Sequence, residues 1–131
     1  MRFGHVAITV SDLERSELFY EHVFGFLRID KIRDKEFTIS IMKKDGIVLE
    51  LFSALNSLSF PGYRKNLETD LRTCGVKHFA FSVDDIEKEY NRLKDKGVEF
   101  LTGIKSLNAK TRYFFIRDPD GIFIEIVQDN E

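Results

Sequence analysis

The chain has 131 residues, of which 43% are hydrophobic and 32% are charged, and its formal net charge is −2 at pH 7. This length suits one domain with a hydrophobic core, or two half-size modules that share a core, but not two independent domains. The small net charge argues against nucleic acid or an anionic membrane as a partner, and the N-terminus reaches acidic residues before any long apolar stretch, so we expect a cytoplasmic protein.

The first half of the sequence predicts a strand followed by a helix. Residues 5–10 alternate in polarity as a half-buried strand does, and the alternation turns His5 away from the aliphatic face. Ser11 and Glu14 have the spacing of a capping box, and the apolar stripe that follows predicts a helix ending at Gly25. Further strands would complete a βαβββ unit; they are predicted at residues 26–32, 36–42 and 46–52, the last two joined by a hairpin turn at residues 44–46.

The second half repeats this order. A strand is predicted at residues 76–83, and a helix from Asp85 to Lys96, capped by Asp84 and ended by Gly97. The remaining strands are predicted near residues 98–102, 111–117 and 121–127, with a hairpin turn at residues 118–121. We therefore predict one α+β domain over residues 1–131, divided into module 1 at about 1–53, a linker at about 54–74 and module 2 at about 75–131.

The two halves also match in sequence. HVAITVSDLE, which begins at His5, aligns with HFAFSVDDIE, which begins at His78, and DGIVLEL, which contains Glu50, aligns with DGIFIEI, which contains Glu125. The histidines are 73 residues apart (78 minus 5) and the glutamates 75 (125 minus 50). A tandem repeat places equivalent residues about a pseudo-twofold axis, which could bring all four side chains together around a metal ion.

Alternation within the glutamate-bearing strands indicates where these side chains point. Glu50 shares a strand face with Phe52, and Glu125 shares one with Phe123, whereas the opposite faces are aliphatic and suited to pack against helices. We expect the glutamate-bearing faces to form the concave inside of a curved sheet. An isolated buried carboxylate costs several kcal/mol, which a bound divalent cation would offset. The other residues that we predict on this concave side are Thr38, Ser40 and Met42.

The remaining histidine and the cysteine carry less information. A single histidine or glutamate in a strand is usually a solvated polar residue, so the metal interpretation depends on the repeat in both residue type and register. His22 has no counterpart in the second half and is predicted to lie on the surface. Cys74 is the only cysteine, so no internal disulfide is possible, and we predict a reduced structural thiol.

These motifs resemble the vicinal oxygen chelate superfamily, which includes glyoxalase I, methylmalonyl-CoA epimerase, fosfomycin resistance enzymes, bleomycin-binding proteins and extradiol dioxygenases. The resemblance covers nearly the whole chain and is most specific in VSDLERSELFYEHVFGF, LELF, GVKHFAFSVDDI and FFIRDPDGIFIEI. It implies the glyoxalase/bleomycin resistance/dioxygenase fold, in which two tandem βαβββ modules form a curved mixed-sheet cup, and usually a homodimer. Within the superfamily, the order His, Glu, His, Glu resembles the glyoxalase I pattern, which maps onto His5, Glu50, His78 and Glu125. The sequence as a whole is most similar to the bacterial glyoxalase I-like branch.

This ligand set favours one divalent transition metal per site, whether Ni²⁺, Co²⁺, Zn²⁺, Mn²⁺ or Fe²⁺, with two octahedral positions left for water or substrate. The resemblance implies a glyoxalase I-like lyase or isomerase that acts on the hemithioacetal of a 2-oxoaldehyde and a thiol through an enediolate. Glu50 or Glu125 would serve as the general base, and pseudo-symmetry leaves both eligible. The sequence also leaves open whether the site forms within one chain or between two.

Other members of the same superfamily remain alternatives: a metal-dependent epimerase, a dioxygenase, a thiol transferase, or a non-enzymatic drug-binding resistance protein. Dioxygenases and the thiol transferases use three protein ligands, so Glu50 argues against them. Glutathione-using glyoxalase I enzymes carry an arginine shortly after the first histidine, and here residues 7–10 read AITV, which puts glutathione in doubt. Candidate contacts for an anionic substrate are Arg64, Lys65, Lys105, Lys110 and Arg112.

Overall fold

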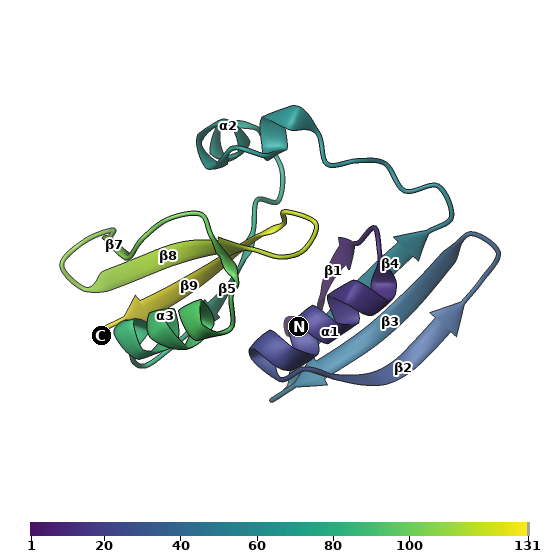
Figure 1. The fold of residues 1–131 in the computed structure, drawn as a ribbon, viewed down its shortest axis with the longest axis horizontal. Helices are drawn as coiled ribbons and strands as arrows, with labels where there is room; N and C mark the ends of the chain where they lie inside the picture. The colour runs from purple at the N-terminus through teal and green to yellow at the C-terminus, as the bar shows by residue number, and fades with distance from the viewer. Residues whose placement is uncertain (131) are drawn as a thin grey trace. The chain divides into compact units, whose positions relative to one another are not determined.

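The computed structural model describes residues 1–130 and consists of two compact units, Met1–Ser59 and a second unit that begins at Phe60. Each unit has one mixed β-sheet with a helix on one face (Figure 1). The predicted α+β architecture of two βαβββ-like units is confirmed. The boundary between the units falls inside the predicted linker. Within residues 1–130, no helix is both long and apolar enough to cross a membrane.

Unit 1 follows the predicted order of elements. They are β1 (Val6–Thr9), α1 (Leu13–Phe24), β2 (Leu27–Arg33), β3 (Phe37–Lys44) and β4 (Ile47–Ala54). The sheet order is β1-β4-β3-β2, with β1 parallel to β4 and the other pairs antiparallel. Helix α1 contacts β3 and β4 and buries Tyr20 and Val23 with Leu49 and Leu51, which form the core of this unit.

Unit 2 repeats this arrangement around a second core. Its elements are a 3-10 turn η1 (Gly62–Arg64), α2 (Leu67–Arg72), β5 (Phe79–Ser82), α3 (Ile86–Asp95), β6 (Glu99–Phe100), β7 (Lys105–Ser106), β8 (Thr111–Arg117) and β9 (Phe123–Asp129). The strand order is β5-β9-β8-β6, with β5 parallel to β9, and β7 also pairs with β8. Leu93 of α3 is buried with Ile124 and Ile126 of β9.

Three of these elements were not predicted from the sequence: η1, α2 and β7. Asn66 caps α2, since its side-chain oxygen accepts the backbone N–H groups of Glu68 at 3.0 Å and Thr69 at 3.3 Å. A helix of six residues is too short to show an amphipathic period, and β7 has only two residues. The segment predicted as a linker therefore has structure of its own.

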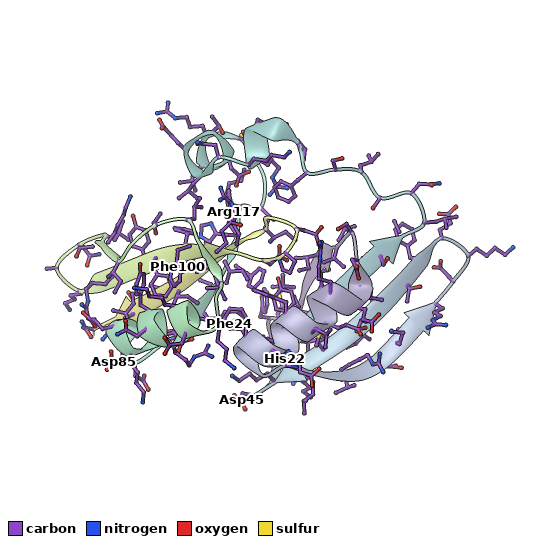
Figure 2. All side chains as sticks on the ribbon, viewed as in Figure 1. His22, Phe24, Asp45, Asp85, Phe100 and Arg117 are labelled. Carbon is purple, nitrogen blue, oxygen red and sulfur yellow. The ribbon has the colours of Figure 1, made fainter. Side chains whose placement is uncertain are left out.

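The N-terminal caps of both longer helices lie one residue later than predicted. Asp12, not Ser11, caps α1, because its carboxylate accepts the N–H of Arg15 at 3.0 Å while the Ser11 hydroxyl accepts from the Arg15 guanidinium. Asp85, not Asp84, caps α3 in the same way, at 2.9 Å (Figure 2). A carboxylate also interacts favourably with the positive end of the helix dipole. The two caps are 73 residues apart (85 minus 12) and so belong to the repeat.

Candidate metal site

In unit 1 the parallel pairing of β1 and β4 brings His5 and Glu50 together. Ala7 lies opposite Glu50, and His5, two residues earlier, points to the same face of the sheet. Nε2 of His5 lies 3.6 Å from Oε2 of Glu50, and the side chains are 50% and 21% exposed. The predicted facing of both residues is confirmed.

The same pairing in unit 2 places His78 beside Glu125. Ala80 of β5 lies opposite Glu125 of β9, and Nε2 of His78 lies 2.9 Å from Oε2 of Glu125, a hydrogen-bonding distance. Both side chains are about one-fifth exposed, at 22% and 21%. The ring of Phe115 meets the imidazole edge-on with centroids 4.9 Å apart, and Nδ1 of His78 is buried with no hydrogen-bond partner among residues 1–130.

Both pairs have donors and spacings that suit a divalent ion. Two ligand atoms bound to one ion at about 2.1 Å, at right angles, are about 3 Å apart, and a wider ligand angle increases this distance. The separations of 2.9 Å in the His78 pair and 3.6 Å in the His5 pair are compatible with ligation by neighbouring positions. Within either unit, the described residues bring two such ligands together rather than three or more. A site that uses all four residues stays a prediction.

The strand register corrects one part of the predicted cup. Lys44 lies opposite Ile47 across a two-residue turn in which Asp45 and Gly46 both have positive φ, 47° and 82°, as a type I′ turn requires. Three residues further from the turn on each strand, Ile41 lies opposite Glu50. Directly opposed residues point to the same face. The residues of β3 that share a face with Glu50 are therefore Phe37, Ile39, Ile41 and Lys43.

The placement of Thr38, Ser40 and Met42 on the concave side was wrong. Ser40 lies opposite Leu51 and Met42 opposite Leu49, which puts them on the face that packs against α1. Ser40 is fully buried and Met42 is 1% exposed. The error came from assigning the face of β3 without using the hairpin turn, which sets its register to β4.

The face of unit 2 that carries Glu125 is aromatic and cationic. Phe115 lies opposite Glu125, Tyr113 opposite Val127 and Arg117 opposite Phe123. The Arg117 guanidinium lies 5.8 Å from the centre of the Phe123 ring and hydrogen-bonds Glu99 at 2.8 Å. Phe123 was placed correctly. Phe115 and Arg117 were missed, although the predicted turn at residues 118–121 pairs their strand with β9.

Two of the candidate anion contacts already have acidic partners. Arg64 donates to Asp70 at 3.0 Å, and Arg112 donates to both carboxylate oxygens of Glu87. The Arg112 guanidinium holds the pKa of Glu87 below its ordinary value. Lys105 lies opposite Tyr113, on the Glu125 face. The two remaining candidate anion contacts, Lys65 and Lys110, are exposed, and so is Cys74. His22 is also exposed, as predicted (Figure 2).

Comparison with known proteins gives a family match over most of the chain. A protein-family model described as Glyoxalase/Bleomycin resistance protein/Dioxygenase superfamily matches residues 2–126. Uncharacterized protein YwkD of Bacillus subtilis is 30% identical over 127 residues, which are 95% of this chain and 94% of that protein. A lactoylglutathione lyase of Schizosaccharomyces pombe is 31% identical over 148 residues, which cover 99% of this chain but 48% of that protein.

Solved structures agree with this match. The crystal structure of a glyoxalase family protein from Enterococcus faecalis superposes with a TM-score of 0.81 at 25% identity and covers 96% of both chains. The trypanothione-dependent glyoxalase I of Leishmania major superposes with a TM-score of 0.73 at 23% identity, over 98% of this chain and 86% of that one. The second likeness concerns the fold alone.

Proposed function

The chain belongs to the Glyoxalase/Bleomycin resistance protein/Dioxygenase superfamily, and we propose that it is a divalent-metal-dependent lyase or isomerase of the glyoxalase I kind. The proposed substrate is the hemithioacetal of a 2-oxoaldehyde and a small thiol, and the product is the thioester of a 2-hydroxy acid. The observation that carries this proposal is the repeated His-Glu pair, His5 with Glu50 and His78 with Glu125, at equivalent places in two copies of one sheet.

The proposed ligands are the four residues of these pairs. Each pair combines an imidazole nitrogen with a carboxylate oxygen, a donor set that suits Ni²⁺, Co²⁺, Zn²⁺, Mn²⁺ or Fe²⁺. Cys74, the only thiol in the sequence, belongs to neither pair, which argues against a closed structural zinc site. A bound ion would stabilise the negative charge that develops on the substrate oxygens during proton removal.

The chain's own carboxylates would carry the proton. Glu50 or Glu125 removes the proton from the carbon that bears sulfur and oxygen, and returns it to the adjacent carbonyl carbon. The electrons of the broken C–H bond form a double bond to the adjacent carbon, whose carbonyl oxygen takes the negative charge. When that carbon is reprotonated, the hydroxyl of the first carbon becomes the thioester carbonyl and its proton passes to the oxygen of the second carbon, so the reaction needs no external oxidant or reductant. Both carboxylates are 21% exposed, so neither is excluded as the base.

The sequence after His5 bears on the identity of the substrate's thiol. Some relatives bear the name lactoylglutathione lyase, but residues 7–10, which follow His5 shortly, read AITV, without a basic residue. A smaller or differently charged thiol than glutathione is therefore proposed as the natural partner. We further propose a homodimer, as the family resemblance implies.

Elemental analysis of protein purified without chelator is the first test. We expect about one divalent transition ion per chain in the wild type, and its loss in the Glu50→Gln, Glu125→Gln double variant. Glu21→Gln with Glu36→Gln is a matched control, because these two glutamates are exposed and belong to neither pair. Metal-free wild type that also takes up no added Ni²⁺, Zn²⁺ or Mn²⁺ would overturn the proposal and favour a non-enzymatic drug-binding protein.

The reaction is tested with metal-loaded protein and methylglyoxal mixed with several thiols. We expect thioester formation with at least one thiol, and incorporation of solvent deuterium at the carbon that receives the proton. A protein that binds metal but only inverts a carbon next to a carbonyl would instead be an epimerase of the same superfamily.

A further inference from the structure

We propose that Asp70 is a positioning residue for His78: together with Arg64 and Lys77 it forms a clamp that holds the backbone immediately before this histidine. The metal role of His78 rests on the proposed function, whereas the clamp itself is a feature of unit 2. The clamp involves α2, the helix that was not predicted from the sequence.

The centre of the clamp is a buried carboxylate with two cationic neighbours. Asp70 is 1% exposed, and its Oδ1 accepts a hydrogen bond from Nε of Arg64 at 3.0 Å and lies 3.5 Å from Nζ of Lys77. Its Oδ2 is buried without a hydrogen-bond partner in the part of the chain that the structure describes. Burying an aspartate is unfavourable unless nearby cations compensate it, so the three side chains depend on one another.

The cations bind backbone as well as the carboxylate. Nζ of Lys77 donates to the carbonyl of Asp70 at 2.6 Å and to the carbonyl of Thr73, so it caps the C-terminal end of α2. Nη2 of Arg64 donates to the carbonyl of Val76 at 3.1 Å. The two residues immediately before His78 are therefore both attached to the clamp, one through its side chain and the other through its backbone.

The clamp is also attached to the sheet that carries Glu125. Nη2 of Arg117, at the end of β8, donates to the carbonyl of Lys65 at 3.0 Å, directly after η1. β8 pairs with β9, where Phe115 lies opposite Glu125. The same strand thus holds η1 in place and supplies the ring that packs against His78. Restraint of this kind reduces the number of positions that the imidazole can occupy relative to Glu125.

Unit 1 offers a natural comparison. His5 follows residues 1–4, which are exposed, and no ion pair among the described residues involves them. His5 is 50% exposed and 3.6 Å from its glutamate, whereas His78 is 22% exposed and 2.9 Å from its own. If Lys77 served only to cap α2, loss of Asp70 would lower stability without a specific change at His78. The clamp predicts that specific change.

The three histidines of the chain allow a direct test by NMR. In metal-free protein labelled at the histidine rings, His5, His22 and His78 each give one Cε1–H signal, and the Phe115 ring shifts that of His78. At a fixed pH, we expect Asp70→Asn to shift or broaden the His78 signal and to leave the His5 and His22 signals unchanged. Glu68→Gln is the matched control, because it removes a carboxylate from the same helix. Among residues 1–130, the Glu68 carboxylate forms its ion pair with Arg72, and both side chains are exposed.

A folded Asp70→Asn protein whose His78 signal matches the wild type would overturn the clamp. Should this variant unfold, Arg64→Lys decides the question. A lysine can still pair with Asp70, but it cannot also reach the Val76 carbonyl as the guanidinium does. We expect a smaller change of the His78 signal in this variant, and an unchanged signal would reject the proposal.

Metal binding provides a separate readout. In calorimetric titrations with Ni²⁺, we expect Asp70→Asn to bind about tenfold more weakly than the wild type, as is typical when the support of a ligand is lost, and Glu68→Gln to bind normally. Equal Ni²⁺ affinity in folded Asp70→Asn and wild type would contradict the positioning role. A wild type that takes up none of Ni²⁺, Zn²⁺ and Mn²⁺ would instead contradict the proposed function, while the histidine signals would still decide whether the clamp exists.

Discussion

The two His-Glu pairs occupy equivalent places in two copies of one sheet, yet they are held differently. His78 packs against Phe115, lies 2.9 Å from Glu125 and follows a clamped segment. His5 is half exposed, 3.6 Å from Glu50, and follows four exposed residues. The sequence repeat therefore accounts for the residue types and for the sheet face on which each pair lies. Local packing determines how firmly the side chains of each pair are held.

The faces that carry the glutamates differ as well. In unit 1 the neighbours of Glu50 are aliphatic, with Ile41 directly opposite it and Ile39 opposite Phe52. In unit 2 the face bears Phe115, Tyr113 and Arg117. Glu50 thus lies among mainly aliphatic side chains, and Glu125 lies among aromatic side chains and one cation. The following predictions test this difference between the two units, from the largest expected effect to the smallest.

Removal of the buried carboxylate from the clamp is expected to have the largest effect on stability. Asp70→Ala leaves Arg64 and Lys77 without their buried partner, so the free energy of unfolding should fall by about 3–5 kcal/mol. Urea denaturation measures this change. Glu68→Ala, on the exposed side of the same helix, should change stability by much less. Similar losses in the two variants would show that Asp70 is no more important than a surface residue.

Single substitutions of the two glutamates test their equivalence. Glu50→Gln and Glu125→Gln each retain the size of the side chain but remove a base and an anionic ligand. We expect kcat to fall by about 100-fold or more in either variant. Metal affinity should fall further in Glu125→Gln, because its pair is the better organised of the two. A larger loss of affinity in Glu50→Gln would contradict our interpretation of the two pairs.

The aromatic contact at His78 gives a smaller effect. Phe115→Leu removes the edge-on ring, and edge-to-face contacts of this kind contribute about 1 kcal/mol. We expect metal affinity, measured by calorimetry, to fall about fivefold as a consequence. Phe52→Leu in unit 1 should leave affinity nearly unchanged, because that ring packs against Phe37 instead of a histidine. Equal effects of the two substitutions would remove this difference between the units.

The smallest effect concerns the surface pair of Arg112 and Glu87. Hydrogen bonds from Arg112 lower the pKa of Glu87 from its ordinary value of 4.5, so the pair stabilises the fold at pH values above the unfolded pKa and loses this contribution as the pH falls through the folded pKa. Glu87→Gln should therefore be slightly less stable than the wild type at pH 7, and the difference should disappear in acid. Thermal denaturation across this pH range measures it.

A control for this effect comes from the repeat. Glu14 is the equivalent of Glu87 in unit 1 (87 minus 73), and no ion pair to an arginine is formed there among residues 1–130. Glu14→Gln should therefore show no comparable pH-dependent loss. A stability difference for Glu87→Gln that persists at low pH would show that the ion pair is not its cause.

Much of the fold was predictable because it follows from local patterns. Strand alternation, the apolar stripes of α1 and α3, and the turns at residues 44–46 and 118–121 depend on residues close together in the chain. The facing of His5, Glu50, His78 and Glu125 followed from the same alternation. The register of β3 was also predictable, because a two-residue turn at Asp45 and Gly46 determines it.

The sequence by itself thus determined the repeat, the two His-Glu pairs and the sheet face on which each pair lies. Only the tertiary structure decided how each pair is supported. Asp70 is buried because Arg64 and Lys77 compensate its charge, and Phe115 meets His78 because β8 pairs with β9. The contact of Phe115 with His78 joins residues that are distant in sequence, and Asp70 lies in a helix of only six residues. Neither feature produces a periodic sequence pattern, because such a pattern arises only from regular spacing along one longer element.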